Sequence, residues 1–113
     1  MTVTKRDMDA ALARLTEAFP QTFVLEKYQP HWPLKVGIAA DIPARCPDLK
    51  RRVLSLVLTA YANRVMYLKA MTAGTARVGL DGKEAGEVTA RDAQYAAATL
   101  AKILASRQYC STG

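Results

Sequence analysis

The sequence is poor in the residues from which metal centres, disulfide frameworks and most catalytic sites are built. It has one histidine and two cysteines, and Cys46 and Cys110 lie far apart and form no metal-binding or redox motif. We expect two free thiols in a reducing compartment, with no metal and no cofactor. The acidic residues are scattered without a convincing catalytic pair, and no glycine-rich phosphate loop is present. These absences predict a protein that is not an enzyme and has no small-molecule substrate.

Long apolar runs are lacking as well. No stretch approaches the roughly 20 apolar residues that a membrane-spanning helix needs. Residues 1–14 mix charges and lack the apolar centre of a signal peptide. We therefore expect a cytoplasmic protein that makes no membrane contact.

The sequence does have enough apolar residues for one core, together with an excess of positive charge. Half of its 113 residues are hydrophobic, which suits a single domain over residues 1–113. We place the core at about residues 7–107 and expect residues 108–113 to fray. The net charge is +6 and the isoelectric point about 9.6. An excess of this size favours an anionic partner, either nucleic acid or an acidic membrane surface.

Hydrophobic periodicity predicts a compact α+β fold that is mostly α-helical, with small strands and a hairpin. Thr4 and Asp7 have the spacing of a helix start, and Asp81-Gly82 is a strong signal for the turn of the hairpin. The longer predicted helices span residues 7–18, 49–63, 64–73 and 89–107, and the predicted strands span residues 34–39, 76–80 and 86–88.

Several residues are assigned to the ends of these elements. Asp41 is the predicted N-cap of a short helix that begins at Ile42, and Asp48 plays the same part before the helix over residues 49–63. Gly74 is the predicted C-cap of the helix that precedes it.

The apolar residues of two helices predict which faces are buried. The final helix has an apolar stripe along its length, and its many alanines are expected to pack against the core of the domain. We expect Trp32 to anchor the proline-bounded loop that contains it. In the helix over residues 49–63, the predicted buried stripe is Leu49, Val53, Leu56, Val57 and Ala60; in the final helix, the stripe is Tyr95, Ala98, Leu100, Ile103 and Leu104.

One segment concentrates positive charge, because residues 45–69 contain a single acid, Asp48. This pattern fits a solvated basic face or a set of phosphate contacts, and the basic balance of the whole chain favours the phosphate contacts. The basic residues of the segment are Arg45, Lys50, Arg51, Arg52, Arg64 and Lys69.

Three other places in the sequence have more than one interpretation. The helix start at Asp41 could bind a phosphate together with Lys35, although an ordinary capped helix start is favoured by the residues alone. Asp41 could instead accept a hydrogen bond from a sugar hydroxyl. Tyr67 is either a residue at the edge of the core whose hydroxyl reaches water or a contact to a nucleotide. Arg77 is either solvated or paired with a phosphate.

Short motifs in a particular order make the chain resemble the ProQ/FinO family of bacterial RNA chaperones. The resemblance covers about residues 11–107. Its motifs are Phe19-Pro20 with Phe23, Pro33-Leu34-Lys35-Val36-Gly37-Ile38 with Asp41, Tyr61, Tyr67-Leu68, the run from Gly74 to Gly82, and Gly86.

The resemblance implies a mostly helical domain that binds structured RNA at the base of terminator stem-loops and at the U-rich 3′ end. It also implies a part in post-transcriptional regulation by small RNAs. The turn over residues 38–42 and the hairpin over residues 80–82 resemble the pocket for the terminal nucleotides. The predicted RNA-binding residues are Lys35, Gly37, Asp41, Arg51, Arg52, Tyr67, Lys69 and Arg77.

The chain departs from the family pattern at three positions. Gly79 stands where the family often has an acidic residue, and Ser55 and Thr59 stand where arginines are common. Arg51 and Arg52 are then expected to supply the charge that binds the duplex.

Two other classes of function remain open at this stage. The helices on either side of Arg64 have the spacing of a DNA-binding helix pair, although no glycine turn separates them. The alanine-rich final helix would suit a protein-interaction adaptor. We expect a monomer.

Overall fold

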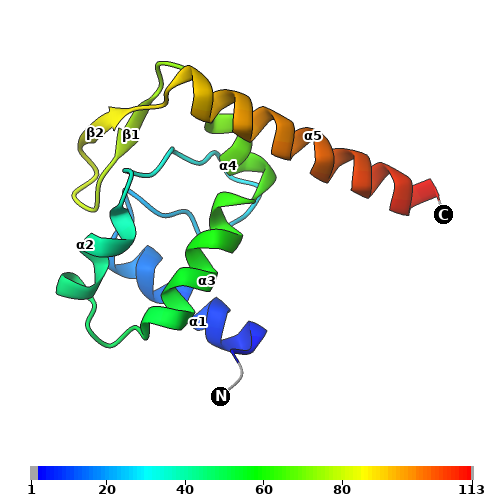
Figure 1. The fold of residues 1–113 in the computed structure, drawn as a ribbon. Helices are drawn as coiled ribbons and strands as arrows, with labels where there is room; N and C mark the ends of the chain where they lie inside the picture. Colours follow the sequence, from blue (N-terminus) through cyan, green and yellow to red (C-terminus); the bar gives the residue numbers. More distant parts are fainter. Residues whose placement is uncertain (1–2, 113) are drawn as a thin grey trace.

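The computed structural model describes residues 3–112, and the side chains of residues 3–107 (Figure 1). The predicted fold class is confirmed, because the described residues form five helices and one small antiparallel sheet of two strands, which lies at one edge of the molecule. No helix among the described residues is long and apolar enough to cross a membrane. The elements are α1 (Lys5–Ala18), α2 (Ile38–Arg45), α3 (Arg51–Ala62), α4 (Val65–Ala70), β1 (Ala76–Val78), β2 (Glu84–Glu87) and α5 (Ala90–Thr112).

Helix α1 begins and ends where the sequence predicts. The Thr4 hydroxyl accepts a hydrogen bond from the Asp7 backbone N–H at 3.2 Å, and the Asp7 carboxylate accepts one from the Thr4 N–H at 3.0 Å. This capping box satisfies two backbone donors at the helix start. The hydrogen bond from the Thr4 N–H also lowers the pKa of Asp7. The helix stops at Ala18, before Phe19-Pro20.

The core lies between α1, α2 and α3 and is centred on aromatic side chains. The ring of Tyr61 packs edge-on against Phe23, with 5.4 Å between centroids, and against Tyr67 at 5.7 Å. The Tyr61 hydroxyl accepts the backbone N–H of Val24 at 2.9 Å, so its buried polar end is paired. Leu15 and Ile42 are fully buried beside this group.

The predicted strand over residues 34–39 is wrong. Only Leu34 pairs with a strand residue, in a single parallel bridge to Val78. Gly37 then adopts φ +81°, a left-handed conformation that glycine tolerates, and becomes the N-cap of α2. Asp41 therefore lies inside the first turn of α2 and does not cap it. Val36 is 71% exposed, whereas Leu34 and Ile38, which would share a face with it in a strand, are buried.

Helix α3 begins later than predicted, with Lys50 as its N-cap. Asp48 lies two residues before this N-cap and does not cap the helix, and its carboxylate pairs with Arg14 Nε at 3.3 Å. The buried face also differs from the prediction. Leu56 is 40% exposed and Ala60 is exposed, contrary to prediction. Leu49 and Val53 are partly buried, Val57 is buried as predicted, and the buried face of the helix consists of Leu54, Val57 and Tyr61.

The hairpin forms where predicted, with an irregular register. Ala76 pairs with Glu87 and Val78 with Glu84, so one strand carries an extra residue between these pairs. The turn closes with a hydrogen bond from Gly82 N–H to the Gly79 carbonyl at 3.0 Å. Gly74 does not cap α4, which ends at Ala70, but turns the chain toward β1 with φ +87°.

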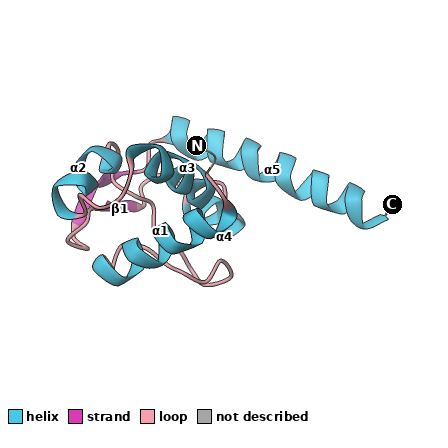
Figure 2. Cartoon of the chain, turned by 90° about the horizontal axis from the view of Figure 1, so that it is seen from below, coloured by secondary structure: helices cyan, strands magenta, loops and turns pink. Residues whose placement is uncertain are grey.

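Helix α5 projects away from the rest of the molecule (Figures 1 and 2). It packs against α4 near its start, and Ala96 is its only buried residue among those whose side chains are described. The prediction that its alanines and apolar stripe pack inward is therefore wrong for most of the helix. Tyr95 is 76% exposed and Leu104 45%. The helix continues past Arg107 to Thr112, and the predicted fraying of residues 108–113 stays a prediction.

His31, and not Trp32, anchors the loop between α1 and α2. Its ring packs against Tyr61 in a tilted arrangement, with 5.0 Å between ring centroids, and Nδ1 lies 2.6 Å from the Gln29 carbonyl oxygen. Burial lowers the pKa of His31. Arg64 also holds this loop, by donating from Nη1 to the Val24 carbonyl at 3.1 Å. Trp32 is 45% exposed.

Candidate nucleic-acid interface

The segment that carries Lys35 is held by hydrogen bonds on both sides of Leu34. The Tyr67 hydroxyl accepts the Leu34 N–H at 3.0 Å, and Arg77 Nη1 donates to the Leu34 carbonyl at 2.8 Å. The Lys35 N–H donates to the Val78 carbonyl at 2.9 Å. The backbone on which Lys35 stands is thus fixed by α4 and β1.

Tyr67 and Arg77 belong to the interior of the domain. Tyr67 is 6% exposed and its hydroxyl is engaged with Leu34, so it does not reach water as the sequence suggested. Burial raises the pKa of Tyr67. Arg77 is 7% exposed, its Nη2 donates to Asp92 at 2.9 Å, and its Nε finds no partner among the described residues. Both side chains position Leu34 and present little surface to a phosphate.

A hollow of about 450 Å³ lies between α2 and the hairpin, and we call it the end pocket. It brings together the two segments that the sequence analysis assigned to terminal nucleotides. Lys35 reaches into it and pairs with Asp41, at 2.7 Å between Nζ and Oδ2. The charged residues around it are Lys35, Asp41, Arg45, Asp81 and Glu84.

The end pocket has mixed charge, with two cations against three carboxylates. Lysine and arginine can contact bridging phosphates, while carboxylates accept hydrogen bonds from hydroxyl groups. A free terminal sugar therefore suits this pocket better than a terminal phosphate, whose charge the three carboxylates would repel. Sequence reasoning did not place Arg45 or Glu84 here, because their approach depends on how the hairpin folds over α2.

Gly79 allows the end pocket to close tightly. A Cβ atom on Gly79 would lie 3.3 Å from Asp81 Oδ1 and 4.0 Å from Lys35 Cδ. The buried Thr22 hydroxyl also donates to the Gly79 carbonyl at 2.7 Å. The family often has an acidic residue at this position. Here glycine leaves room for the hairpin to pack close to Lys35.

A second hollow, of about 670 Å³, runs between α2 and α3 and shares Ala40 with the end pocket. Arg51 stands on its wall, followed along α3 by Ser55 and Thr59. The Thr59 hydroxyl donates back to the Ser55 carbonyl at 2.9 Å. Arg51 is the one basic residue on this wall, so the charge in the groove is concentrated near the start of α3.

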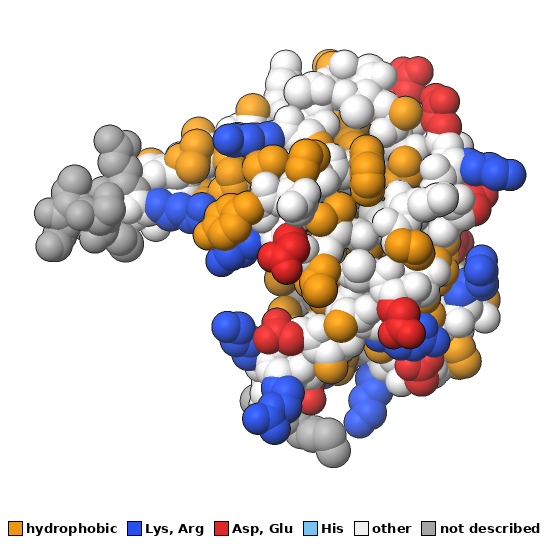
Figure 3. All heavy atoms as spheres, turned by 180° about the vertical axis from the view of Figure 1, so that it is seen from behind, with side chains coloured by type: hydrophobic (Ala, Val, Ile, Leu, Met, Phe, Trp, Pro, Cys, Tyr) orange, Lys and Arg blue, Asp and Glu red, His pale blue; other side chains and the backbone are white. Residues whose placement is uncertain are grey.

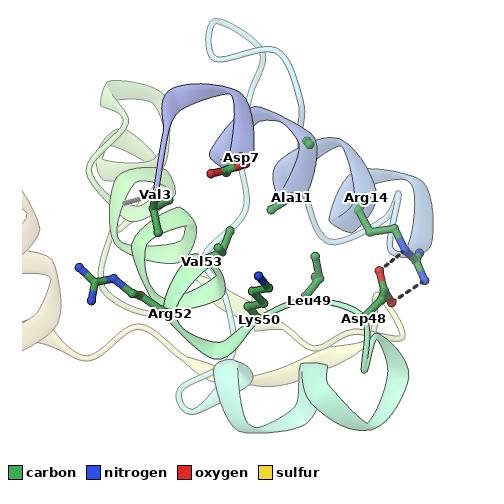
Figure 4. Close-up of a pocket in the computed structure, with 10 residues that line it drawn as sticks. Val3, Asp7, Ala11, Arg14, Asp48, Leu49, Lys50, Arg52 and Val53 are labelled. Atoms are coloured by element: carbon green, nitrogen blue, oxygen red, sulfur yellow. Dashed lines mark hydrogen bonds and ion pairs between the residues drawn. The ribbon is translucent and has the colours of Figure 1, made fainter. Parts of the chain in front are cut away.

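Arg52 points in a different direction from Arg51. It lies on a largely apolar hollow of about 410 Å³ between α1 and α3. Figure 4 shows Arg52 extending outward at one end of this hollow, while the Arg14–Asp48 ion pair closes the other end. Consecutive residues on a helix differ in direction by about 100°, so the two arginines serve different faces.

The remaining basic residues are dispersed. Lys69 is exposed in the last turn of α4 and lines neither groove nor end pocket. Arg64, predicted to belong to the basic face, instead holds the loop carbonyls of Val24 and Leu25. Figure 3 shows basic side chains at the edges of the rear face rather than in one patch. No cluster of possible metal ligands occurs among the described residues.

A mostly helical domain with one small hairpin is a fold that solved structures share. The model of the ProQ/FINO family matches residues 5–110. This chain belongs to that family, in agreement with the motifs that the sequence analysis identified.

Solved structures confirm the fold. A ProQ homolog from Legionella pneumophila, determined by NMR, matches with a TM-score of 0.74 and 30% identity, over 90% of this chain and 87% of the other. A FinO-like RNA chaperone from Neisseria meningitidis matches with a TM-score of 0.65 and 25% identity, over 82% and 93% of the two chains.

Curated relatives are named RNA chaperone ProQ. One from Shewanella piezotolerans is 37% identical over 97 residues, which are 83% of this chain and 45% of the relative. Another from Vibrio vulnificus is 32% identical over 111 residues, 96% of this chain and 53% of the relative. The chain thus spans about half the length of these relatives.

Proposed function

We propose that this chain is a non-catalytic RNA-binding protein of the RNA chaperone type, which holds the base of a stem-loop and the free 3′ end beside it. The single observation that carries the proposal is the end pocket, in which Lys35 and Asp41 meet the hairpin. The names of the relatives and of one solved neighbour, all RNA chaperones, support it. A role beside small regulatory RNAs in the cytoplasm belongs to the same proposal.

The end pocket would hold the last nucleotides of the RNA. Lys35 and Arg45 would contact bridging phosphates, and the carboxylates of Asp41, Asp81 and Glu84 would accept hydrogen bonds from sugar hydroxyls. Gly37 turns the chain so that the start of α2 faces the same space.

The duplex would lie along the groove between α2 and α3. Arg51 at the mouth of this groove would contact the phosphate backbone, and Arg52 and Lys69 would extend the contact on neighbouring faces. An A-form duplex is recognised by its backbone and shape, so we expect little sequence preference within the stem. Tyr67 and Arg77 would act on RNA indirectly, by positioning Leu34 and hence Lys35.

The decisive experiment uses a terminator-like hairpin with a U-rich tail, prepared with either a free 3′ hydroxyl or a 3′ phosphate. We expect tight binding to the hydroxyl form and at least tenfold weaker binding to the phosphate form, which corresponds to about 1.4 kcal/mol. The physical reason is repulsion between the added phosphate and the three carboxylates of the end pocket. Binding is measured by filter retention or fluorescence anisotropy at two salt concentrations.

The matched control is Lys35→Ala, which should bind both RNAs weakly and discriminate less between them. Equal binding of the wild-type protein to both RNA forms would contradict the end pocket as the site for the 3′ terminus. Competition with duplex DNA tests the DNA-binding alternative. The structure offers that alternative little support, because α4 is only six residues long and buries Tyr67 and Leu68.

A further inference from the structure

A separate hollow of about 370 Å³ lies between α4 and the first turns of α5, and we call it the α5 hollow. It is not part of the end pocket or of the groove between α2 and α3. Its lining is mostly apolar, from residues such as Ala62, Leu68 and Met71. The residues of the lining that carry polar groups are Asn63, Tyr67, Arg77, Asp92 and Tyr95. The space is of a size and character that suits a small planar ring.

Two large apolar side chains stand at the α5 hollow without packing into the core. Tyr95 on α5 is 76% exposed, and Val36 in the loop before α2 is 71% exposed. Burying an apolar side chain stabilises a structure, and most of the surface of these two side chains stays exposed within the domain. An exposed tyrosine ring beside an apolar hollow is a platform on which a nucleobase can stack.

The polar groups of the α5 hollow have unused hydrogen-bonding capacity. Asp92 Oδ2 accepts from Arg77, and the Asn63 amide donates to the Thr59 carbonyl at 3.0 Å. No described residue donates a hydrogen bond to the second carboxylate oxygen of Asp92 or to the amide oxygen of Asn63. Such acceptors match the N–H groups on the edge of an unpaired base.

The α5 hollow and the end pocket are lined by consecutive residues of one segment. Lys35 lines the end pocket and Val36, the next residue, lines the α5 hollow. Consecutive Cα atoms are about 3.8 Å apart, so the backbone of this segment separates the two linings by a single residue. Charge favours this path, because the exposed Arg91 stands at the start of α5 and no acidic residue follows Asp92 in the sequence.

We propose that the α5 hollow accepts one unpaired base of the RNA strand whose end occupies the end pocket, with the ring of Tyr95 stacked on that base. Asn63 and Asp92 face the polar edge of the base, while Val36 and Met71 contact its apolar surface. This inference rests on the proposed function, and it adds a site for a base to a surface otherwise made of backbone contacts.

The test is a scan of the single-stranded tail of the hairpin, in which each nucleotide in turn lacks its base. With the wild-type protein, one tail position should show a loss of roughly fivefold or more, the size expected for one stacked base. The Tyr95→Ala variant should bind the intact RNA roughly fivefold more weakly than the wild-type protein does. Removal of the same base should then cause no further loss of affinity. Tyr95→Phe keeps the ring and should behave as the wild-type protein does.

The matched control is Tyr28→Ala, because Tyr28 is 77% exposed and lines neither the end pocket nor the α5 hollow. It should leave the scan unchanged. Urea unfolding of each variant separates loss of binding from loss of folding.

Three results would overturn the inference. The first is a scan in which no single tail base affects the affinity of the wild-type protein more than the others. The second is a Tyr95→Ala variant that loses affinity equally for every RNA of the scan, whichever base is missing. The third is a change of oligomeric state in Tyr95→Ala with unchanged RNA binding, which would assign the hollow to a second copy of the chain. If Lys35→Ala still weakens binding in any of these cases, the proposed function stands without the base site. If Lys35→Ala and the 3′ phosphate have no effect either, the proposed function itself fails.

Discussion

At the scale of single residues, the positions predicted to bind RNA differ in exposure. Lys35, Arg51 and Arg52 are accessible, whereas Tyr67 and Arg77 are buried and hold the backbone of Leu34. A motif residue can therefore shape the candidate site by orienting a neighbour, because such a hydrogen bond is as demanding in geometry as a direct contact.

Tyr61 gives a prediction about pH. Burial raises its pKa to about 12 from an ordinary value of 10.0. The fold therefore favours the neutral phenol, and the stability due to Tyr61 is complete below pH 10 and is lost as the pH rises through about 12. We expect the free energy of unfolding of the wild-type protein to fall more steeply over this alkaline range than that of Tyr61→Phe.

Tyr61→Phe also has an effect at neutral pH. The substitution leaves the Val24 N–H without its acceptor, which should cost about 1–3 kcal/mol at pH 7. Urea unfolding at several pH values measures both effects. Parallel pH profiles of the two proteins above pH 10 would show that Tyr61 is not the group responsible.

At the scale of elements, the start of α2 is the feature that periodicity alone misjudged. Leu34, Val36 and Ile38 alternate as strand residues do, yet Leu34 and Ile38 are also spaced as neighbours across a helical turn. Both are buried, and Val36 is exposed. The left-handed backbone of Gly37 decides between these patterns by turning the chain into a helix.

Gly37→Ala tests this turn. A Cβ atom on residue 37 would meet nothing within 4 Å. The substitution should therefore lower the free energy of unfolding through backbone strain alone, by about 1–2 kcal/mol for a residue in the left-handed region. We expect lower stability in urea unfolding and weaker binding of the hairpin with a free 3′ end. Gly37→Asn should lose less stability, since asparagine tolerates this conformation.

The control is Gly86→Ala, because Gly86 lies on β2 with φ +101°. This variant should lose stability while keeping selectivity for the 3′ hydroxyl. Full stability of Gly37→Ala would show that φ is not constrained there.

At the scale of the whole molecule, the net charge is +6, and several of the described basic residues lie at different hollows. Arg51 lies beside the groove between α2 and α3, and Arg52 lies on the hollow between α1 and α3. Arg45 and Lys35 share the end pocket with three carboxylates. In the proposed function, overall charge would attract RNA to the molecule, while the shape and mixed polarity of the end pocket would select where it binds.

Salt dependence distinguishes an arginine that touches phosphate from one that supports the fold. Arg51→Ala should weaken RNA binding and flatten the dependence of log K on log salt by about one unit. Arg77→Ala should weaken binding with an unchanged slope, and should lower stability by about 1–3 kcal/mol because the Leu34 carbonyl loses its donor. Binding titrations at four salt concentrations and urea unfolding measure these effects. A slope flattened by Arg77→Ala would place Arg77 on a phosphate.

The sequence by itself determined the fold class, the first helix with its capping box, the hairpin and the family. The first helix and the hairpin depend on local patterns, namely the Thr4–Asp7 spacing and the Asp81-Gly82 turn. The family depends on short motifs that occur in a fixed order along the chain. Only the tertiary structure decided which residues are accessible. Arg77 and Lys35 are both basic residues near glycines, but one is buried against α5 and the other opens into the end pocket. Burial depends on which elements pack together, and local sequence carries little information about such distant contacts.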